Sequence, residues 1–204
     1  MKNKIKMLAG TAALAVLLFA SVPAMAATDS TAANASGFYV GAFGGWTWND
    51  TDAPLGVDLG VDGSDWGLFA GYDLTGLFQS GNTGLTAAIE LHYAWSTADD
   101  SSALASIDKN NEWGISLRPG LTALNMNGIK PYGIIGYSNT EFETTTAGGT
   151  VDDDFDGLEL GVGVEVPVFN NFGVRVDYAH VFYGSEGGTD PDGDNLRFGA
   201  AYHF

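Results

Sequence analysis

The sequence predicts an all-β fold, namely an eight-stranded antiparallel transmembrane β-barrel arranged as an up-and-down meander. Three observations support this prediction. Apolar and polar residues alternate with a period of two over segments of about ten residues, as in strands with one lipid-facing side. Regular turn signals separate these segments. The last segment, 196–204, alternates in the same way, is rich in aromatic residues and ends on Phe204.

Residues 1–26 are predicted to be a secretory signal peptide for export through the Sec pathway. Lys2, Lys4 and Lys6 precede an apolar stretch, and a small-residue cleavage site ends at Ala26. The apolar run is short for a retained membrane helix. Residues 27–36 then form a short lead-in, and residues 37–204 are expected to form the barrel domain.

The composition excludes several classes of partner and site. The chain has no cysteine, which excludes disulfides and thiolate metal sites. It has 25 acidic residues against 8 basic ones, and three of the basic residues lie in the predicted signal peptide. Nucleic acid is therefore not expected as a partner, since phosphate binding needs a basic face. No later apolar run approaches the length of a spanning helix, so a membrane would have to be crossed by a closed barrel.

The first four strands are predicted at 37–48, 64–75, 84–97 and 110–122. In each, the larger apolar residues share one parity and glycine or polar residues occupy the other. The third strand shows this most clearly: Leu85, Ala87, Ile89, Leu91, Tyr93 and Trp95 alternate with Thr86, Ala88, Glu90, His92 and Ala94.

The fifth strand, 130–142, has ambiguous parity, so its faces stay unassigned. The sixth and seventh strands, around 158–166 and 174–182, flank a tight turn at Asn170-Asn171. If Val168 pairs with Phe172 across this turn, Glu165 lies directly opposite Arg175. The eighth strand, 196–204, has Leu196, Phe198, Ala200, Tyr202 and Phe204 on its apolar face.

The connections differ strongly in charge. Loops are predicted at 49–63, 98–109, 143–154 and 184–195, and with their flanking strand mouths they hold 19 of the 25 acidic residues. The alternate turns, at 76–83, 123–129 and 170–171, hold none. Long acidic loops at one end and short turns at the other indicate an extracellular and a periplasmic end.

Aromatic residues are predicted to form a girdle at each end of the apolar band. All five tryptophans belong to the loop-end girdle: Trp46, Trp48, Trp66, Trp95 and Trp113. The opposite girdle consists of Phe38, Tyr72, Phe172, Tyr202 and Phe204. Such amphipathic rings are typical of the headgroup level of a membrane.

The inward face is predicted to contain a cluster of ion pairs. Its members are Asp73, Glu90, His92, Arg118, Glu159, Glu165, Arg175, Asp177 and Arg197. An eight-stranded barrel is just wide enough for its own side chains to fill it, so these groups should pair with one another. Arg118 with Glu90, and Arg197 with Asp177 or Glu159, are plausible pairs. The alternative is a small gated porin or channel lined by the same groups.

The aromatic last strand and the two girdles resemble those of the OmpA/OmpX-like family of small outer-membrane barrels, which includes opacity-type surface proteins. The resemblance implies that Tyr202 and Phe204 form an assembly signal for the barrel assembly machinery. It also implies a monomer in the outer membrane of a Gram-negative bacterium, with a structural or surface-interaction role. The partners expected are outer-membrane lipid and lipopolysaccharide, with divalent cations bridging acidic loops to anionic headgroups.

An enzyme is not expected, although a lipid-modifying outer-membrane enzyme stays open as an alternative. Outer-membrane lipid A deacylases use a His-x-Ser motif, whereas His180 is followed two residues later by Phe182. No cofactor or metal site is predicted. Asp190, Asp192 and Asp194 resemble a fragment of a calcium loop, but no bidentate glutamate follows, which favours a solvated acidic turn. A soluble ligand-binding barrel is disfavoured because the inward set is charged and the outward set apolar.

Overall fold

The computed structural model describes residues 36–52, 58–80, 83–101, 105–123, 128–146, 149–169, 171–184 and 190–204. The predicted signal peptide, 1–26, and most of the lead-in lie outside these residues. The strands are β1 (Gly37–Asp52), β2 (Asp58–Ser80), β3 (Thr83–Ser96), β4 (Asp99–Ser101), β5 (Ala105–Ala123), β6 (Lys130–Thr146), β7 (Gly149–Phe169), β8 (Phe172–Tyr183) and β9 (Asp190–His203).

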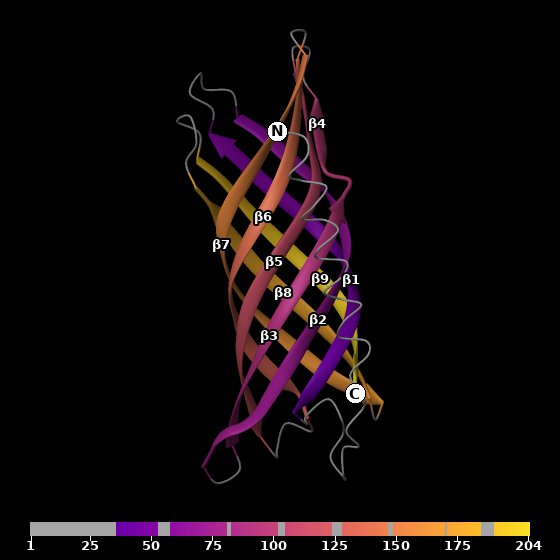
Figure 1. Cartoon of the computed structure of the whole chain (residues 1–204), viewed down its shortest axis with the longest axis vertical. Coiled ribbons are helices and arrows are strands. Elements are labelled where there is room, and N and C mark those ends of the chain that lie inside the picture. Colours follow the sequence, from indigo (N-terminus) through magenta and orange to yellow (C-terminus); the bar gives the residue numbers. More distant parts are fainter. Residues whose placement is uncertain are drawn as a thin grey trace.

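Eight of these strands form one closed antiparallel meander (Figure 1). The sheet closes because β1 pairs with β2 along one edge and with β9 along the other. The short β4 continues the position of β3 toward the loop end, since it pairs with both β2 and β5 beyond the end of β3. The predicted all-β, eight-stranded meander is therefore confirmed.

The two faces of the sheet differ in the way the alternation predicts. Leu68, Ile89, Leu117 and Val162 point outward, with between 46% and 63% of their surface exposed. So large an apolar surface would promote aggregation in water and suits lipid. In the part of the chain that the structure describes, no helix has the length and apolar character needed to cross a membrane.

The structure assigns the faces of the fifth predicted strand, β6. Lys130, Tyr132 and Ile134 are buried inside the barrel, whereas Ile135 and Tyr137 are exposed on the outside. The parity is hard to predict because large apolar or aromatic residues occupy both faces of this strand.

The strands are longer than predicted at the loop end. Most of the four segments predicted as acidic loops belong to paired strands; β6 and β7, for example, stay paired out to Thr146 and Gly149. Polar and threonine-rich segments can continue a sheet in water because their backbone groups stay hydrogen-bonded to neighbouring strands. At the other end, β2 likewise extends to Ser80 through most of a predicted turn.

The turn between β7 and β8 differs in detail from its prediction. Phe172 is opposite Phe169 rather than Val168, because the register shifts by one residue between Pro167 and Phe169. Glu165 is nevertheless opposite Arg175. The irregularity is confined to the turn and leaves the pairing of the spanning segment as predicted.

Candidate functional site

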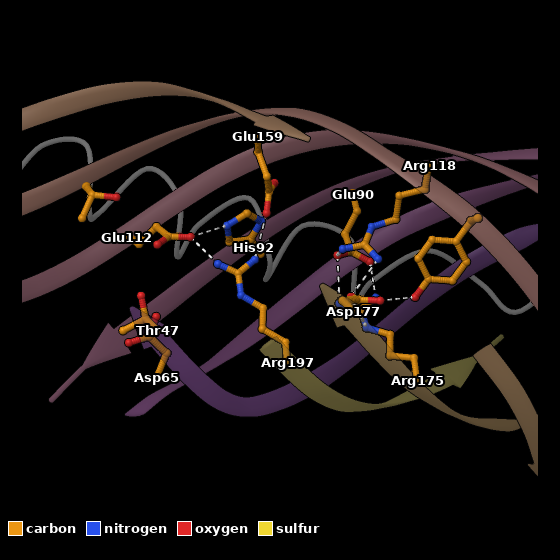
Figure 2. A network of polar contacts seen from close by, with 12 residues as sticks. Thr47, Asp65, Glu90, His92, Glu112, Arg118, Glu159, Arg175, Asp177 and Arg197 are labelled. Carbon is orange, nitrogen blue, oxygen red and sulfur yellow. Dashed lines mark hydrogen bonds and ion pairs between the residues drawn. The ribbon is translucent and has the colours of Figure 1, made fainter. Parts of the chain in front are cut away.

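The barrel interior contains a dense set of charged groups. All five Lys and Arg residues of 27–204 are buried there. Seven buried carboxylates accompany them: Asp65, Asp73, Glu90, Glu112, Glu159, Glu165 and Asp177. His92 and His203 are buried on the same face. These groups form three clusters stacked along the barrel, two of which appear in Figure 2.

The central cluster contains Glu90, Arg118, Arg175 and Asp177. Glu90 accepts two hydrogen bonds from Arg175, at 2.5 and 3.0 Å, and lies 2.7 Å from Arg118 Nη2. Asp177 accepts a hydrogen bond of 3.0 Å from Arg118 and one from the Tyr132 hydroxyl. Arg175 also lies over the Phe69 ring, 3.5 Å from its centroid. Each guanidinium is thereby held between carboxylates contributed by β3 and β8.

The loop-side cluster contains Asp65, His92, Lys109, Glu112, Glu159 and Arg197. Lys109 Nζ lies 3.0 Å from Asp65 and 2.9 Å from Glu112. Arg197 pairs with Glu112 and, at 3.1 Å, with Glu159. His92 Nε2 lies 3.2 Å from Glu112, so one carboxylate has three cationic or potentially cationic neighbours.

The turn-side cluster contains Asp73, Lys130, Glu165 and His203. Lys130 Nζ lies 3.1 Å from each carboxylate oxygen of Asp73 and 3.7 Å from Glu165. His203 contacts Glu165 at 3.1 Å and Asp73 at 3.5 Å. A cavity of about 10 Å³ borders this cluster and the central one, which is room for roughly one water molecule.

The structure brings the predicted interior residues together, but not always as adjacent-strand pairs. Arg118 contacts Glu90 and Arg197 contacts Glu159, whereas Asp177, directly opposite Arg197 in register, pairs with Arg118 instead. Arg175 likewise reaches across the barrel to Glu90, although Glu165 is its neighbour in the sheet.

Five residues of these clusters, including His203, are absent from the predicted interior set. Asp65, Lys109 and Glu112 were assigned to acidic strand mouths or a loop, yet each is at most 2% exposed. A register shift between Lys109 and Glu112 turns both side chains inward despite their odd spacing. Lys130 was missed because the parity of its strand was ambiguous. The charge balance of the sequence was the signal that could have found these residues. With only five basic residues for 25 acidic ones, each basic side chain can be buried beside several carboxylates.

The predicted girdle residues lie on the outer face. Trp66 and Trp95 stack with ring centroids 4.5 Å apart. Trp46 contacts Phe198, and Trp113 contacts Tyr137. Trp48 has 40% of its surface exposed. At the turn end, Tyr202 packs between Phe172 and Phe204. The Phe204 amide donates a hydrogen bond to Phe38 O at 2.9 Å, which ties the chain end to β1.

His180 lies on the outer face near the loop end. Its Nδ1 is 2.9 Å from Asp194 Oδ1, which also accepts a hydrogen bond of 2.7 Å from the Tyr178 hydroxyl. The Phe182 ring occupies the position two residues on, 4.3 Å from the imidazole centroid. Of the weak metal candidates, Asp192 and Asp194 contact His180, while the side chain of Asp190 lies outside the described residues. No three His, Asp or Glu side chains in the described ranges are grouped to hold a metal ion.

A row of carboxylates crosses the sheet at the loop end. Successive register partners on β2, β4, β5, β6 and β7 are Asp62, Asp99, Asp108, Glu143 and Asp152. Direct partners point to the same face, and neighbouring strands lie about 4.8 Å apart, so the row is roughly 19 Å long. We call it the carboxylate row. Because every Lys and Arg of 27–204 is inside the barrel, no basic side chain of the described residues lies beside the row.

Among the solved structures that resemble this chain, Neisserial surface protein A supports the same fold. Neisserial surface protein A (NspA) is 19% identical, with a TM-score of 0.57, over 83% of this chain and 98% of that one. Ail, the attachment invasion locus protein of Yersinia pestis, is 15% identical with a TM-score of 0.49, over 83% and 100% of the two chains. The outer membrane enzyme PagL is 16% identical with a TM-score of 0.46, over 81% and 99%. No curated protein sequence matches significantly.

The family comparison is decisive for the class of protein. The family model described as "Outer membrane protein beta-barrel domain" matches residues 12–204, which is almost the whole chain. A closed meander, an apolar outer face and a charged, filled interior agree with that match. The chain therefore belongs to the outer-membrane β-barrel family, among the small barrels of the OmpA/OmpX-like type.

Proposed function

We propose that this protein is a closed, monomeric barrel with a structural and surface-interaction role, and that it neither conducts ions nor catalyses a reaction. The observation that supports this proposal is the stack of three ion-pair clusters in the interior. The buried side chains of Asp73 in the turn-side cluster, Glu90 in the central cluster and Glu112 in the loop-side cluster, each at most 2% exposed, occupy successive levels of the barrel. A permeating ion would have to separate these pairs, and each separation exposes uncompensated buried charge.

Single-channel recording in a planar bilayer tests the closed state. The refolded barrel is expected to give no conductance steps, because a permeating ion would have to separate the buried ion pairs. Matched recordings use Arg118→Gln, which alters the central cluster, and Glu141→Gln, which alters the loop end. Reproducible wild-type steps whose size changes in Arg118→Gln but not in Glu141→Gln would make the interior an ion path and overturn the closed state.

The enzyme alternative has one observation in its favour, the hydrogen bond between His180 and Asp194. This arrangement could orient an imidazole base. The nearby position two residues along β8 is occupied by Phe182, which has no nucleophilic atom. A non-enzymatic role therefore fits these side chains better.

The loop end supports a role for divalent cations at the membrane surface. Like charges directly opposite one another across strands are destabilising, and the carboxylate row places five in succession. The row lies next to the tryptophan girdle, since Trp48 is the register partner of Asp62. We infer that Mg²⁺ or Ca²⁺ bridges these carboxylates to anionic lipopolysaccharide headgroups.

Chelation tests this bridging. Adding EDTA to native outer membranes is expected to increase cleavage of the loop end by a protease specific for aspartate, and restoring Mg²⁺ should reverse the increase. The doubly neutralised variant Asp108→Asn/Glu143→Gln should respond less to EDTA, because fewer carboxylates need bridging. Unchanged cleavage on chelation would contradict the proposal, as would an equal Mg²⁺ effect in vesicles that lack lipopolysaccharide.

A further inference from the structure

The loop-end girdle differs between the two halves of the barrel. All five tryptophans belong to β1, β2, β3 and β5, so β6, β7, β8 and β9 have none. The outer face of these four strands has two aspartates instead, Asp156 on β7 and Asp194 on β9. Asp156 is in one register row with Asn139 and Trp113, and Asp194 is the register partner of Trp48. Both carboxylates therefore lie at the level of the tryptophan girdle.

The first of these carboxylates is held by side chains of three neighbouring strands. Asp156 Oδ1 accepts a hydrogen bond from the Tyr137 hydroxyl and another, of 2.8 Å, from Asn139 Nδ2. The Asn139 amide is fixed in turn, because its Oδ1 accepts a hydrogen bond of 2.9 Å from the Trp113 indole. Asp156 itself is exposed. One of its oxygens is thus held in place while the side chain stays accessible from the membrane surface.

The second carboxylate, between β8 and β9, repeats this arrangement. Asp194 Oδ1 accepts a hydrogen bond of 2.7 Å from the Tyr178 hydroxyl and lies 2.9 Å from His180 Nδ1. The Asp194 side chain is 37% exposed. In both sites the aspartate is the register partner of a polar side chain, and the tyrosine lies two residues before that side chain. The same geometry on two separate strand pairs indicates a shared role.

Each carboxylate keeps one oxygen for a ligand. In the part of the chain that the structure describes, no hydrogen bond reaches Oδ2 of Asp156 or of Asp194. Basic side chains do not supply the counter-charge, since every Lys and Arg of 27–204 is inside the barrel. A cation that pairs with these two carboxylates therefore comes from outside the chain.

The surroundings of the two sites favour an organic ammonium over a metal ion. Ca²⁺ takes about six to eight oxygen ligands, whereas each site offers one carboxylate oxygen. A primary ammonium donates a charge-assisted hydrogen bond to a single oxygen and is attracted to aromatic rings. The Phe182 ring lies 4.3 Å from the His180 ring beside the second site. Exposed apolar side chains continue from both sites along the strands, namely Leu158 and Leu160 on β7 and Phe198 on β9.

We propose that Asp156 and Asp194 each bind the primary ammonium group of a lipid headgroup, and that the acyl chains of this lipid lie along the apolar side chains of the same strands. This inference rests on the proposed surface-interaction role and names the chemical class of a lipid partner. It uses neither the interior clusters nor the carboxylate row. The conductance recordings, the chelation experiment and the lipid-binding assay can therefore fail separately.

The test counts the lipids that the refolded mature chain retains in native mass spectrometry, in the presence of EDTA. The probes are phosphatidylethanolamine, phosphatidylcholine and phosphatidylglycerol with identical acyl chains. Phosphatidylcholine has a quaternary ammonium without N–H donors, and phosphatidylglycerol has no cation. We expect phosphatidylethanolamine to be retained at both sites with a preference of about fivefold, because an exposed ion pair and a cation–π contact each contribute a small factor.

Two results would overturn the proposal. Equal retention of phosphatidylethanolamine and phosphatidylcholine would show that N–H donation to the carboxylates has no role. A preference for phosphatidylglycerol that appears only when Mg²⁺ is added would assign both carboxylates to a metal bridge.

A second arm identifies the source of the ammonium group. It repeats the assay with lipid A that has or lacks a phosphoethanolamine group. Selective retention of the decorated form would identify lipopolysaccharide as the source. Retention of phosphatidylethanolamine without any preference between the two lipid A forms would identify a glycerophospholipid, and both results support the proposed chemistry.

Variants locate the two sites. Asp156→Asn and Asp194→Asn should each remove one of the two retained phosphatidylethanolamine molecules, and the double variant should remove the preference. Asparagine keeps the size of the side chain and an acceptor for the tyrosine, so only the charge changes. Glu141→Gln is the matched control, because Glu141 lies on the same outer face of β6, two residues beyond Asn139, and its loss should leave retention unchanged. An equal loss in Glu141→Gln would show that the lipid responds to the net charge of the loop end, which contradicts the assignment.

Discussion

The variant Glu90→Gln is expected to lose about 3–5 kcal/mol of unfolding free energy, because removing one partner of a buried pair leaves uncompensated charge. Glu90 is fully buried and pairs with both Arg118 and Arg175. Glutamine fills the same volume but leaves two guanidinium groups to share Asp177. Urea titration of the barrel in phospholipid vesicles, followed by tryptophan fluorescence, measures the loss.

Two comparisons show whether charge causes this loss. Glu141→Gln, at the loop end, should change stability by no more than about 0.5 kcal/mol, as for most surface substitutions. The double variant Glu90→Gln/Arg175→Gln should lose less than the sum of its single variants, because it restores the charge balance around Arg118. A loss below about 1 kcal/mol for Glu90→Gln would show that the interior is hydrated enough to screen the arginines.

The sequence was sufficient to predict the strands and most of their faces, for a physical reason. Lipid requires an apolar outer face along each spanning segment, so the period of two is imposed on the sequence wherever a strand crosses. β6 is an exception, because apolar residues occupy both of its faces. Its adjacent residues Ile134 and Ile135 are both apolar, yet one is 2% exposed inside the barrel and the other 51% exposed outside. An apolar residue in the interior removes the contrast on which the prediction depends.

The ion pairs were harder to predict than the faces. Alternation indicates that Arg175 points inward, but its partner Glu90 lies 85 residues away on a strand across the barrel. That contact depends on the relative heights of the strands, which no local pattern reveals. Lys109 and Glu112 show a second limit, because a register shift between them reverses the parity by which the faces were assigned.

The second large loss of stability is expected at Lys109, which lies in a segment that the sequence predicts to be a loop. Lys109→Met should lower the unfolding free energy by about 3–5 kcal/mol, because methionine keeps most of the apolar volume while two buried carboxylates lose a cation. Glu112 still has Arg197 and His92 as neighbours. Asp65 is paired with Lys109 alone among the described ion pairs, so most of the cost should arise at Asp65.

Two double variants distinguish these sources of the cost. Lys109→Met/Asp65→Asn should recover most of the lost stability, since the stranded carboxylate is removed together with its cation. Lys109→Met/Glu112→Gln should recover little, because it leaves Asp65 unpaired and also weakens the support of Arg197, whose remaining carboxylate is Glu159. The urea titration used for Glu90 measures both. Equal recovery in the two double variants would mean that Lys109 is shared evenly between its partners, and that the loop-side cluster acts as one delocalised unit rather than as two unequal pairs.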